Sequence, residues 1–324
     1  MREKSLALGI DIGATRLRIA AVTCSAGGPL IRKVVTREIP AGYATSGEIA
    51  KPDYVAALIY QAVEELDTHE RRCISSVGAP AALLCAVPLS GTSSKHRKRL
   101  ALEEAQSQIN YPLRNAVVKS ATVEPRASLL VLGVVHKAVL HSRVLTLKKA
   151  GMKVLAIDHE ALALRRALPG CTVVADVGHE RASVHWYGAV VPRTVPANCG
   201  GAEVTRAIEA DLSIDPVSAE KRKCKLGTLG AGEAGRAAVT LRLVQSIDVL
   251  REAKHEVPAI TLVGNGSRLT GLAAEVANIT GVRITTADPA AVSTKAYPSD
   301  VLRDNAMDWA LAVGLSLWQS GSKT

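Results

Sequence analysis

Two stretches of the chain, LGIDIGAT at residues 8–15 and VVADVG at residues 173–178, repeat one pattern. Each is an apolar run that ends in Asp-x-Gly, and such a run meeting a glycine turn predicts a β-hairpin. The turn lets backbone N–H groups approach a phosphate, and the carboxylates of Asp11 and Asp176 are suited to a hydrated Mg²⁺. The two aspartates are 165 residues apart (176 − 11), about one domain length. We therefore expect each half of the chain to supply one side of a nucleotide clamp.

A third glycine-rich stretch, ITLVGNGSRL at residues 260–269, reads as a strand, a turn and the start of a helix. This arrangement brings N–H groups and a helix N-terminus to a ligand. A single Asp-x-Gly is more often an ordinary turn. The prediction therefore depends on all three stretches occurring in this order, each directly after an apolar strand.

The length and composition predict a globular α/β protein of two domains. The chain has 324 residues, of which 48% are hydrophobic and 22% are charged. No window approaches the roughly 18 uncharged apolar residues of a membrane span, and the N-terminal residues resemble a strand rather than a signal peptide. We expect a cytoplasmic protein. Its six cysteines are scattered, which predicts reduced thiols rather than zinc ligands or disulfides.

The formal net charge is +10, with basic clusters at residues 95–99 and 221–225. Aromatic residues make up only 3% of the chain, which leaves little to stack on bases, so we expect no nucleic-acid partner. The first cluster is interpreted as the solvated face of a helix. Contact with an anionic membrane surface or an acidic partner is the alternative.

Local patterns place the elements. Apolar spacing and turn residues predict hairpin strands over 5–38 and shorter strands at 74–77, 129–135, 154–157 and 171–176. Helices are expected at 52–66, 97–109, 136–150, 158–169, from 201 onward, 216–226, 233–256 and 304–319. Gly151 and Asp215 are predicted as a C-terminal and an N-terminal helix cap.

In this order, Asp11-Ile12-Gly13, Asp176-Val177-Gly178 and residues 264–267 resemble the two phosphate loops and the adenosine loop of the actin, Hsp70 and sugar kinase superfamily. Within it, the chain is similar to the PilM family of type IV pilus assembly proteins, which is related to the cell-division protein FtsA. The stretches that carry this narrower resemblance are residues 103–113, 148–163, 200–208 with 219–223, and 312–317. The resemblance covers nearly the whole chain.

The resemblance implies an actin-like (RNase H-like duplicated) two-domain fold with a nucleotide cleft between the domains. Domain I is expected over residues 1–168, with an inserted subdomain at about 83–155 and a C-terminal helix, 304–324, that packs back on it. Domain II is expected over 169–303, with subdomain 2B at about 200–258.

The resemblance also implies ATP and Mg as cofactors, with Asp11 and Asp176 holding Mg²⁺ through water. The residues expected at the phosphates are Gly13, Ala14, Thr15, Arg18 and Gly178, with Gly200 and Gly201 opening a helix beside the nucleotide. The adenine and ribose would be packed by Gly264, Gly266, Ser267 and Arg268. Glu220 and Lys223 are expected to reach the ribose and base edge, with a simple ion pair as the alternative.

Glu160 occupies the position where active relatives place the attacking water, which implies at most a slow Mg-dependent ATPase. A structural role near a hinge is the alternative, and Ala161, Ala163 and Gly314 suit close helix packing there. Two departures from the family bear on the affinity for nucleotide. Arg18 stands where the family often has Lys. His179 and Glu180 follow the second phosphate loop, where the carboxylate of Glu180 repels phosphate.

The resemblance implies a cytoplasmic ATP-binding scaffold, peripheral to the inner membrane. It would dock the N-terminal cytoplasmic tail of a PilN-type inner-membrane protein, and it leaves self-assembly and contact with other pilus-machine components open. Two alternatives remain: a small-molecule kinase of the same superfamily, and a nucleotide-free secretion-system scaffold of the GspL type.

Overall fold

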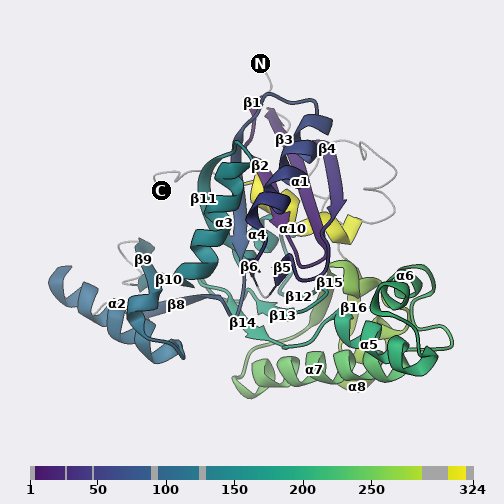
Figure 1. Ribbon diagram of the computed structural model, residues 1–324. Helices are drawn as coiled ribbons and strands as arrows, with labels where there is room; N and C mark the ends of the chain where they lie inside the picture. The colour runs from purple at the N-terminus through teal and green to yellow at the C-terminus, as the bar shows by residue number, and fades with distance from the viewer. Residues whose placement is uncertain are drawn as a thin grey trace.

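The computed structural model describes residues 4–25, 28–45, 47–88, 94–123, 129–286 and 306–318. These residues form two large sheets and a smaller three-stranded sheet, each with helices against it (Figure 1). A two-stranded hairpin, β5 (Ala44–Thr45) and β6 (Glu48–Ile49), adjoins the first large sheet.

The first large sheet has the order β4–β3–β2–β7–β11, and β1 pairs with β3 beyond the end of β2. Its strands are β1 (Lys4–Ser5), β2 (Leu8–Ile12), β3 (Arg16–Ser25), β4 (Gly28–Glu38), β7 (Arg72–Val77) and β11 (Lys153–His159). β2, β3 and β4 are antiparallel neighbours, whereas β7 and β11 are parallel.

The second large sheet repeats this order as β14–β13–β12–β15–β16. Its strands are β12 (Val173–Val177), β13 (Ala182–Trp186), β14 (Arg193–Pro196), β15 (Ala259–Val263) and β16 (Arg283–Thr286). Again the first three strands are antiparallel neighbours and the last two are parallel. The two related halves predicted from the repeated Asp-x-Gly are confirmed.

The two repeated motifs form equivalent hairpin turns. Between β2 and β3 the amide of Gly13 donates to the carbonyl of Arg16 at 2.9 Å. Between β12 and β13 the amide of Gly178 donates to the carbonyl of Arg181 at 2.8 Å. Each turn therefore has four residues and begins with the glycine that follows Asp-x.

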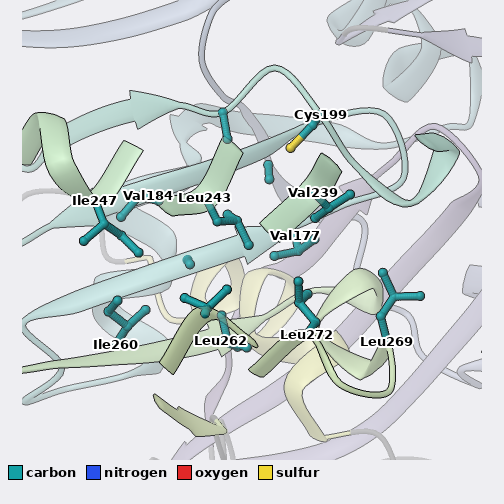
Figure 2. Close-up of a cluster of buried hydrophobic side chains, with 14 of the residues drawn as sticks. Val177, Val184, Cys199, Val239, Leu243, Ile247, Ile260, Leu262, Leu269 and Leu272 are labelled. Atoms are coloured by element: carbon teal, nitrogen blue, oxygen red, sulfur yellow. The ribbon is translucent and has the colours of Figure 1, made fainter. Parts of the chain in front are cut away.

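Helices cover both large sheets. α1 (Pro52–Glu65) and α3 (Lys137–Lys149) pack together on the first sheet, and α5 (Gly201–Leu212), α6 (Pro216–Leu226), α7 (Glu233–Glu252) and α8 (Leu272–Thr280) belong to the second. In Figure 2, Leu243 and Ile247 of α7 lie near Val184 of β13 in the buried core of the second half. The predicted caps are confirmed: Gly151 has φ +75° after α3, and Asp215 accepts from the first amides of α6.

Two helices lie between the large sheets: α4 (Glu160–Ala167) and α10 (Ala310–Ser316). α10 contacts α4, β2 and β7, and one buried cluster joins α10, α4 and Ile74 of β7 to Val174 and Val263 of the second sheet. The predicted C-terminal helix is thus confirmed over 310–316, after a 3-10 turn at Ala306–Trp309. Residues 317 and 318 follow the end of the helix, and the predicted residues 304, 305 and 319–324 lie outside the described ones.

Small residues let α4 and α10 cross closely, as expected for Ala161, Ala163 and Gly314. A Cβ added at Gly314 would lie 1.9 Å from the carbonyl oxygen of Ala163. The guanidinium of Arg166 on α4 donates from Nε to the carbonyl of Gly314 at 2.9 Å. The crossing lies in the buried cluster that also contains Val174 and Val263 of the second sheet.

The small sheet has the order β8–β10–β9, formed by β8 (Ala82–Pro88), β9 (Ala116–Val123) and β10 (Leu129–His136). Helix α2 (Ser94–Gln108) packs on it through Ala101 and Ala105 (Figure 1). We propose that this sheet and α2 are the inserted subdomain. It is shorter than the expected 83–155, because α3 and β11 pack with the first large sheet.

Gly314→Ala is expected to lower the midpoint of thermal unfolding by several degrees. Overpacking of this kind costs about 1–3 kcal/mol, which exceeds the gain of about 1 kcal/mol that alanine has over glycine in a helix. The matched control is Gly133→Ala on β10, where the nearest atom to an added Cβ is Leu84 Cδ2 at 3.9 Å. Equal midpoints for Gly314→Ala and the wild type, measured by circular dichroism, would contradict the close crossing.

Candidate functional site

A cleft of about 700 Å³ lies between the two large sheets and contains both hairpin turns. Its walls come from the first sheet, the second sheet, α6 and the α10 region. Asp11 and Asp176 both line it, as does Glu160, the first residue of α4. The cleft therefore brings together the three carboxylates that the sequence singled out.

These carboxylates are buried close to one another. Burial raises the pKa of Asp11 to about 6, and the charge of Glu160 adds to the rise. Burial raises the pKa of Asp176 to about 7, with further contributions from Glu160 and Asp11. Carboxylates whose charged form is disfavoured in this way attract a cation.

Guanidinium groups supply the positive charge. Arg18 lies 3.8 Å from a carboxylate oxygen of Asp11 and 3.7 Å from one of Asp308. Buried Arg143 donates to the carbonyls of Ile12 and Gly47, at 3.4 and 3.2 Å, and burial lowers its pKa to about 10. Arg268 also lies near Asp308, at 3.6 Å.

Arg181 contacts the opposite half of the protein. It comes from the second turn and donates to the carbonyl of Ala79 at 2.8 Å, with Glu160 at 4.0 Å. The sequence analysis missed Arg143, Arg181 and Asp308. The signal for Arg181 is that both repeated motifs extend to Asp-x-Gly-x-x-Arg, which aligns it with Arg16. Arg143 and Asp308 lie in no motif, since only the fold brings them to the cleft.

Most of the predicted site residues line this cleft: Asp11, Gly13, Ala14, Thr15, Arg18, Glu160, Asp176, Gly178, Gly201, Glu220, Lys223, Gly264, Gly266 and Arg268. Gly200 and Ser267 do not line it. A Cβ added at Gly200 would lie 2.3 Å from the carbonyl oxygen of His179, and the Ser267 hydroxyl donates to the carbonyl of Gly264 at 2.6 Å. Both residues shape loops behind the cleft wall.

The N-terminus of α5 is already occupied. Gly201 and Ala202 donate their amides to the carbonyls of Gly178 and His179 at 2.9 and 2.7 Å, so this helix end holds the second turn in place. In the first turn, by contrast, the amides of Ala14 and Thr15 donate to no group within the described residues. The first turn therefore presents these two amides toward the cleft.

Glu220 and Lys223 bind each other, which is the ion-pair alternative. The ammonium of Lys223 lies 2.6 Å from Glu220 Oε2, 2.9 Å from the Thr205 hydroxyl and 3.0 Å from the Gly201 carbonyl. These three acceptors match the three donors of a lysine. The pair forms a charged wall of the cleft.

The third glycine stretch passes directly beside Asp176. A Cβ added at Gly264, whose φ is +79°, would lie 2.4 Å from Asp176 Oδ1, and one at Gly266 would lie 2.5 Å from Val177 Cγ1. Only glycine allows this approach without displacing the carboxylate.

Within the described ranges, no group of three or more His, Cys, Asp or Glu side chains is arranged to hold a metal ion. Mg²⁺ usually keeps several waters and takes only one or two carboxylates from the protein. The pair Asp11 and Asp176 therefore stays a prediction for a hydrated Mg²⁺. In the same part of the chain no helix is both long and apolar enough to span a membrane.

Two sheets of identical order, with paired Asp-x-Gly turns facing one cleft, define an actin-like fold. The sequence matches the family model described as type IV pilus assembly protein PilM over residues 9–320, so the chain belongs to that family.

Solved structures agree with the fold. The chain is similar to a structure of the PilM-PilN type IV pilus biogenesis complex, with a TM-score of 0.84, 22% identity, and 96% of this chain and 97% of that one covered. EutJ, an ethanolamine utilization protein from Carboxydothermus hydrogenoformans, has a TM-score of 0.59 and 13% identity, with 98% of this chain and 90% of that one covered. A structure of a MamK double helical filament has a TM-score of 0.52 and 14% identity, with 97% of this chain and 99% of that one covered. No curated protein sequence shows a significant match.

Asp176→Asn is expected to stabilise the nucleotide-free protein at pH 7.5. Because the pKa of Asp176 is about 7 in the fold against an ordinary 3.8, the folded state binds more protons between about pH 4 and 7. The free energy of unfolding therefore falls as pH rises through that interval. The neutral amide removes this loss, which amounts to about 1.4 kcal/mol for each pKa unit.

Thermal unfolding at pH 5.0 and 7.5 checks this. The difference in midpoint between Asp176→Asn and the wild type should grow by several degrees from the lower to the higher pH. Asp248→Asn, at a carboxylate about half exposed on α7, is the control and should show no such growth. A midpoint for Asp176→Asn below the wild type at pH 7.5 would contradict the raised pKa.

Proposed function

We propose that the cleft binds ATP with Mg²⁺, the cation lying between Asp11 and Asp176 and bound through water. The observation that carries this proposal is the pair of buried carboxylates with raised pKa values at equivalent places in the two sheets. The residues present fit the group. Among the described residues, two buried cleft atoms, Arg143 Nε and Asp308 Oδ1, have no hydrogen-bond partner.

The phosphates would lie against the first turn, where Gly13, Ala14 and Thr15 supply backbone amides and Arg18 supplies charge. Gly178 would bring the second turn close. At the other end of the cleft, Gly264, Gly266 and Arg268 would pack on adenine and ribose, and Glu220 with Lys223 would form the wall beside the ribose. Gly200, Gly201 and Ser267 would support these loops from behind.

Any turnover would be slow hydrolysis. Glu160 would be the carboxylate that orients a water, and its side chain packs against Gly78, where an added Cβ would overlap the carboxylate. Bound Mg²⁺ supplies charge neutralisation of the phosphates. Arg181 Nη2 lies 4.0 Å from Glu160 Oε1, and the charge of Glu160 contributes to the raised pKa values of both aspartates.

The second part of the proposal is that this chain docks the N-terminal cytoplasmic tail of a PilN-type inner-membrane protein. The similar structure named above is a complex of PilM with PilN. An apolar groove of about 550 Å³ between α3 and β9 supports the docking, lined by Val117, Lys137, Ala138, Leu140, His141 and Val144. Docking there would hold the protein in the cytoplasm at the inner face of the membrane.

Isothermal calorimetry with Mg-ATP tests the cleft. Asp11→Ala removes one of the two carboxylates proposed to hold Mg²⁺, so the variant should bind Mg-ATP about tenfold more weakly than the wild type. Hydrogen bonds involving charged groups contribute about 1.5–3 kcal/mol each. Undetectable binding in both wild type and variant would favour the nucleotide-free scaffold. ADP release above about 1 per second that depends on a sugar or acid would favour the kinase, because that is ordinary enzyme turnover.

Capture from membranes tests the groove. Purified wild-type chain, with and without Mg-ATP, is expected to retain a PilN-type protein, and Leu140→Asp should lose it because a carboxylate in an apolar groove stays desolvated without a partner. Leu241→Asp, at an exposed leucine of α7 outside the groove, is the matched control. Retention by Leu140→Asp at the wild-type level would contradict docking at this groove.

A further inference from the structure

The two equivalent turns end in arginines that do different things. Arg16 closes the first turn and lies 3.4 Å from Glu38 of the same sheet. Arg181 closes the second turn and leaves its own half. Its Nη1 donates to the carbonyl of Ala79 at 2.8 Å, and its Nη2 lies 4.0 Å from Glu160 Oε1.

Both contacts of Arg181 lie on the first half of the protein. Ala79 follows β7 and Glu160 follows β11, so one guanidinium from the second sheet connects to the ends of two strands of the first. The Glu160 carboxylate lies directly against Gly78, since a Cβ placed there would be 1.7 Å from its Oε2. Arg181 thus forms a latch across the cleft, with a carbonyl and a carboxylate as its partners.

The charge of Arg181 acts on the centre of the cleft. It lowers the pKa of both Asp11 and Asp176, and it also lowers that of Arg143. Its side chain is one-quarter exposed. Because a carbonyl is a weaker partner for a guanidinium than a phosphate, which accepts two charge-assisted hydrogen bonds, Arg181 is free to exchange Ala79 for an anion.

We propose that Arg181 determines specificity for a nucleoside triphosphate over a diphosphate, by exchanging its bond to the Ala79 carbonyl for the terminal phosphate. This inference rests on the proposed function of the cleft and adds the residue that senses the third phosphate. The first turn and Arg18 would serve both nucleotides alike. The exchange would also transmit the nucleotide state to the β7–β8 connection and so to the small sheet that follows it.

Calorimetry with Mg-ATP and Mg-ADP on four proteins tests the discrimination: wild type, Arg181→Ala, Arg181→Lys and Arg165→Ala. Arg181→Ala should bind ATP about 10- to 100-fold more weakly, as expected for the loss of charge-assisted hydrogen bonds, and ADP within about threefold of wild type. Arg181→Lys should recover part of the loss, since it keeps the charge without the fork. An equal loss for both nucleotides, or no loss for either, would overturn the assignment.

Arg165→Ala is the matched control. Arg165 on α4 also reaches the second half, donating to the carbonyl of Val190 at 3.2 Å, but it does not line the cleft. The ratio of ATP to ADP affinity should stay at the wild-type value in this variant. A changed ratio in Arg165→Ala would assign the effect to domain contact in general and overturn the specific role of Arg181.

Hydrogen exchange of the nucleotide-free protein separates the latch from nucleotide binding. The segment 78–82 should exchange faster in Arg181→Ala than in wild type or Arg165→Ala, and unchanged exchange would overturn the latch. If the wild type binds neither nucleotide, the proposed function fails and the discrimination with it. If the wild type binds both nucleotides and Arg181→Ala has the same ratio of ATP to ADP affinity, only the assignment of Arg181 fails.

Discussion

Two carboxylates buried in the cleft between the sheets, Asp11 and Asp176, are the constraint on which the rest of this structure depends. Burial disfavours their charged forms, and each raises the cost of charging its neighbours. Arg18 lies beside Asp11, and its charge, with those of Arg143 and Arg181, partly offsets the rise in the pKa of Asp11. Burial therefore keeps the charged forms of both carboxylates costly, and a hydrated Mg²⁺ between them is the cation that the proposed Mg-ATP site would add.

Close backbone approach makes this constraint compatible with a stable fold. Gly264 lets the end of β15 pass Asp176, and Gly314 lets α10 cross α4. The same crossing joins the cores of the two halves, since Val174 and Val263 of the second sheet belong to the cluster that contains α4 and α10. The elements at the floor of the cleft therefore also form the contact between the halves.

The sequence predicted the duplicated sheets and most helices because hairpin turns and helix caps are local signals: Asp215 caps α6 as expected. It missed β8 and β9, whose pairing with β10 is non-local and whose strands follow no repeated motif. It predicted that Asp11 and Asp176 share one cleft. For Glu220 and Lys223 it left a nucleotide contact and an ion pair as alternatives, since spacing on a helix cannot tell one from the other. Arg181 is recognised as a site residue only when the two turns are aligned with each other.

The most direct test is a crystal structure of the chain grown with Mg²⁺ and a non-hydrolysable ATP analogue. The expected structure has a triphosphate between the turns 13–16 and 178–181, with a hydrated Mg²⁺ contacting both Asp11 and Asp176 through water. An analogue bound elsewhere, or a nucleotide in the cleft with either carboxylate turned away from a shared cation, would contradict it.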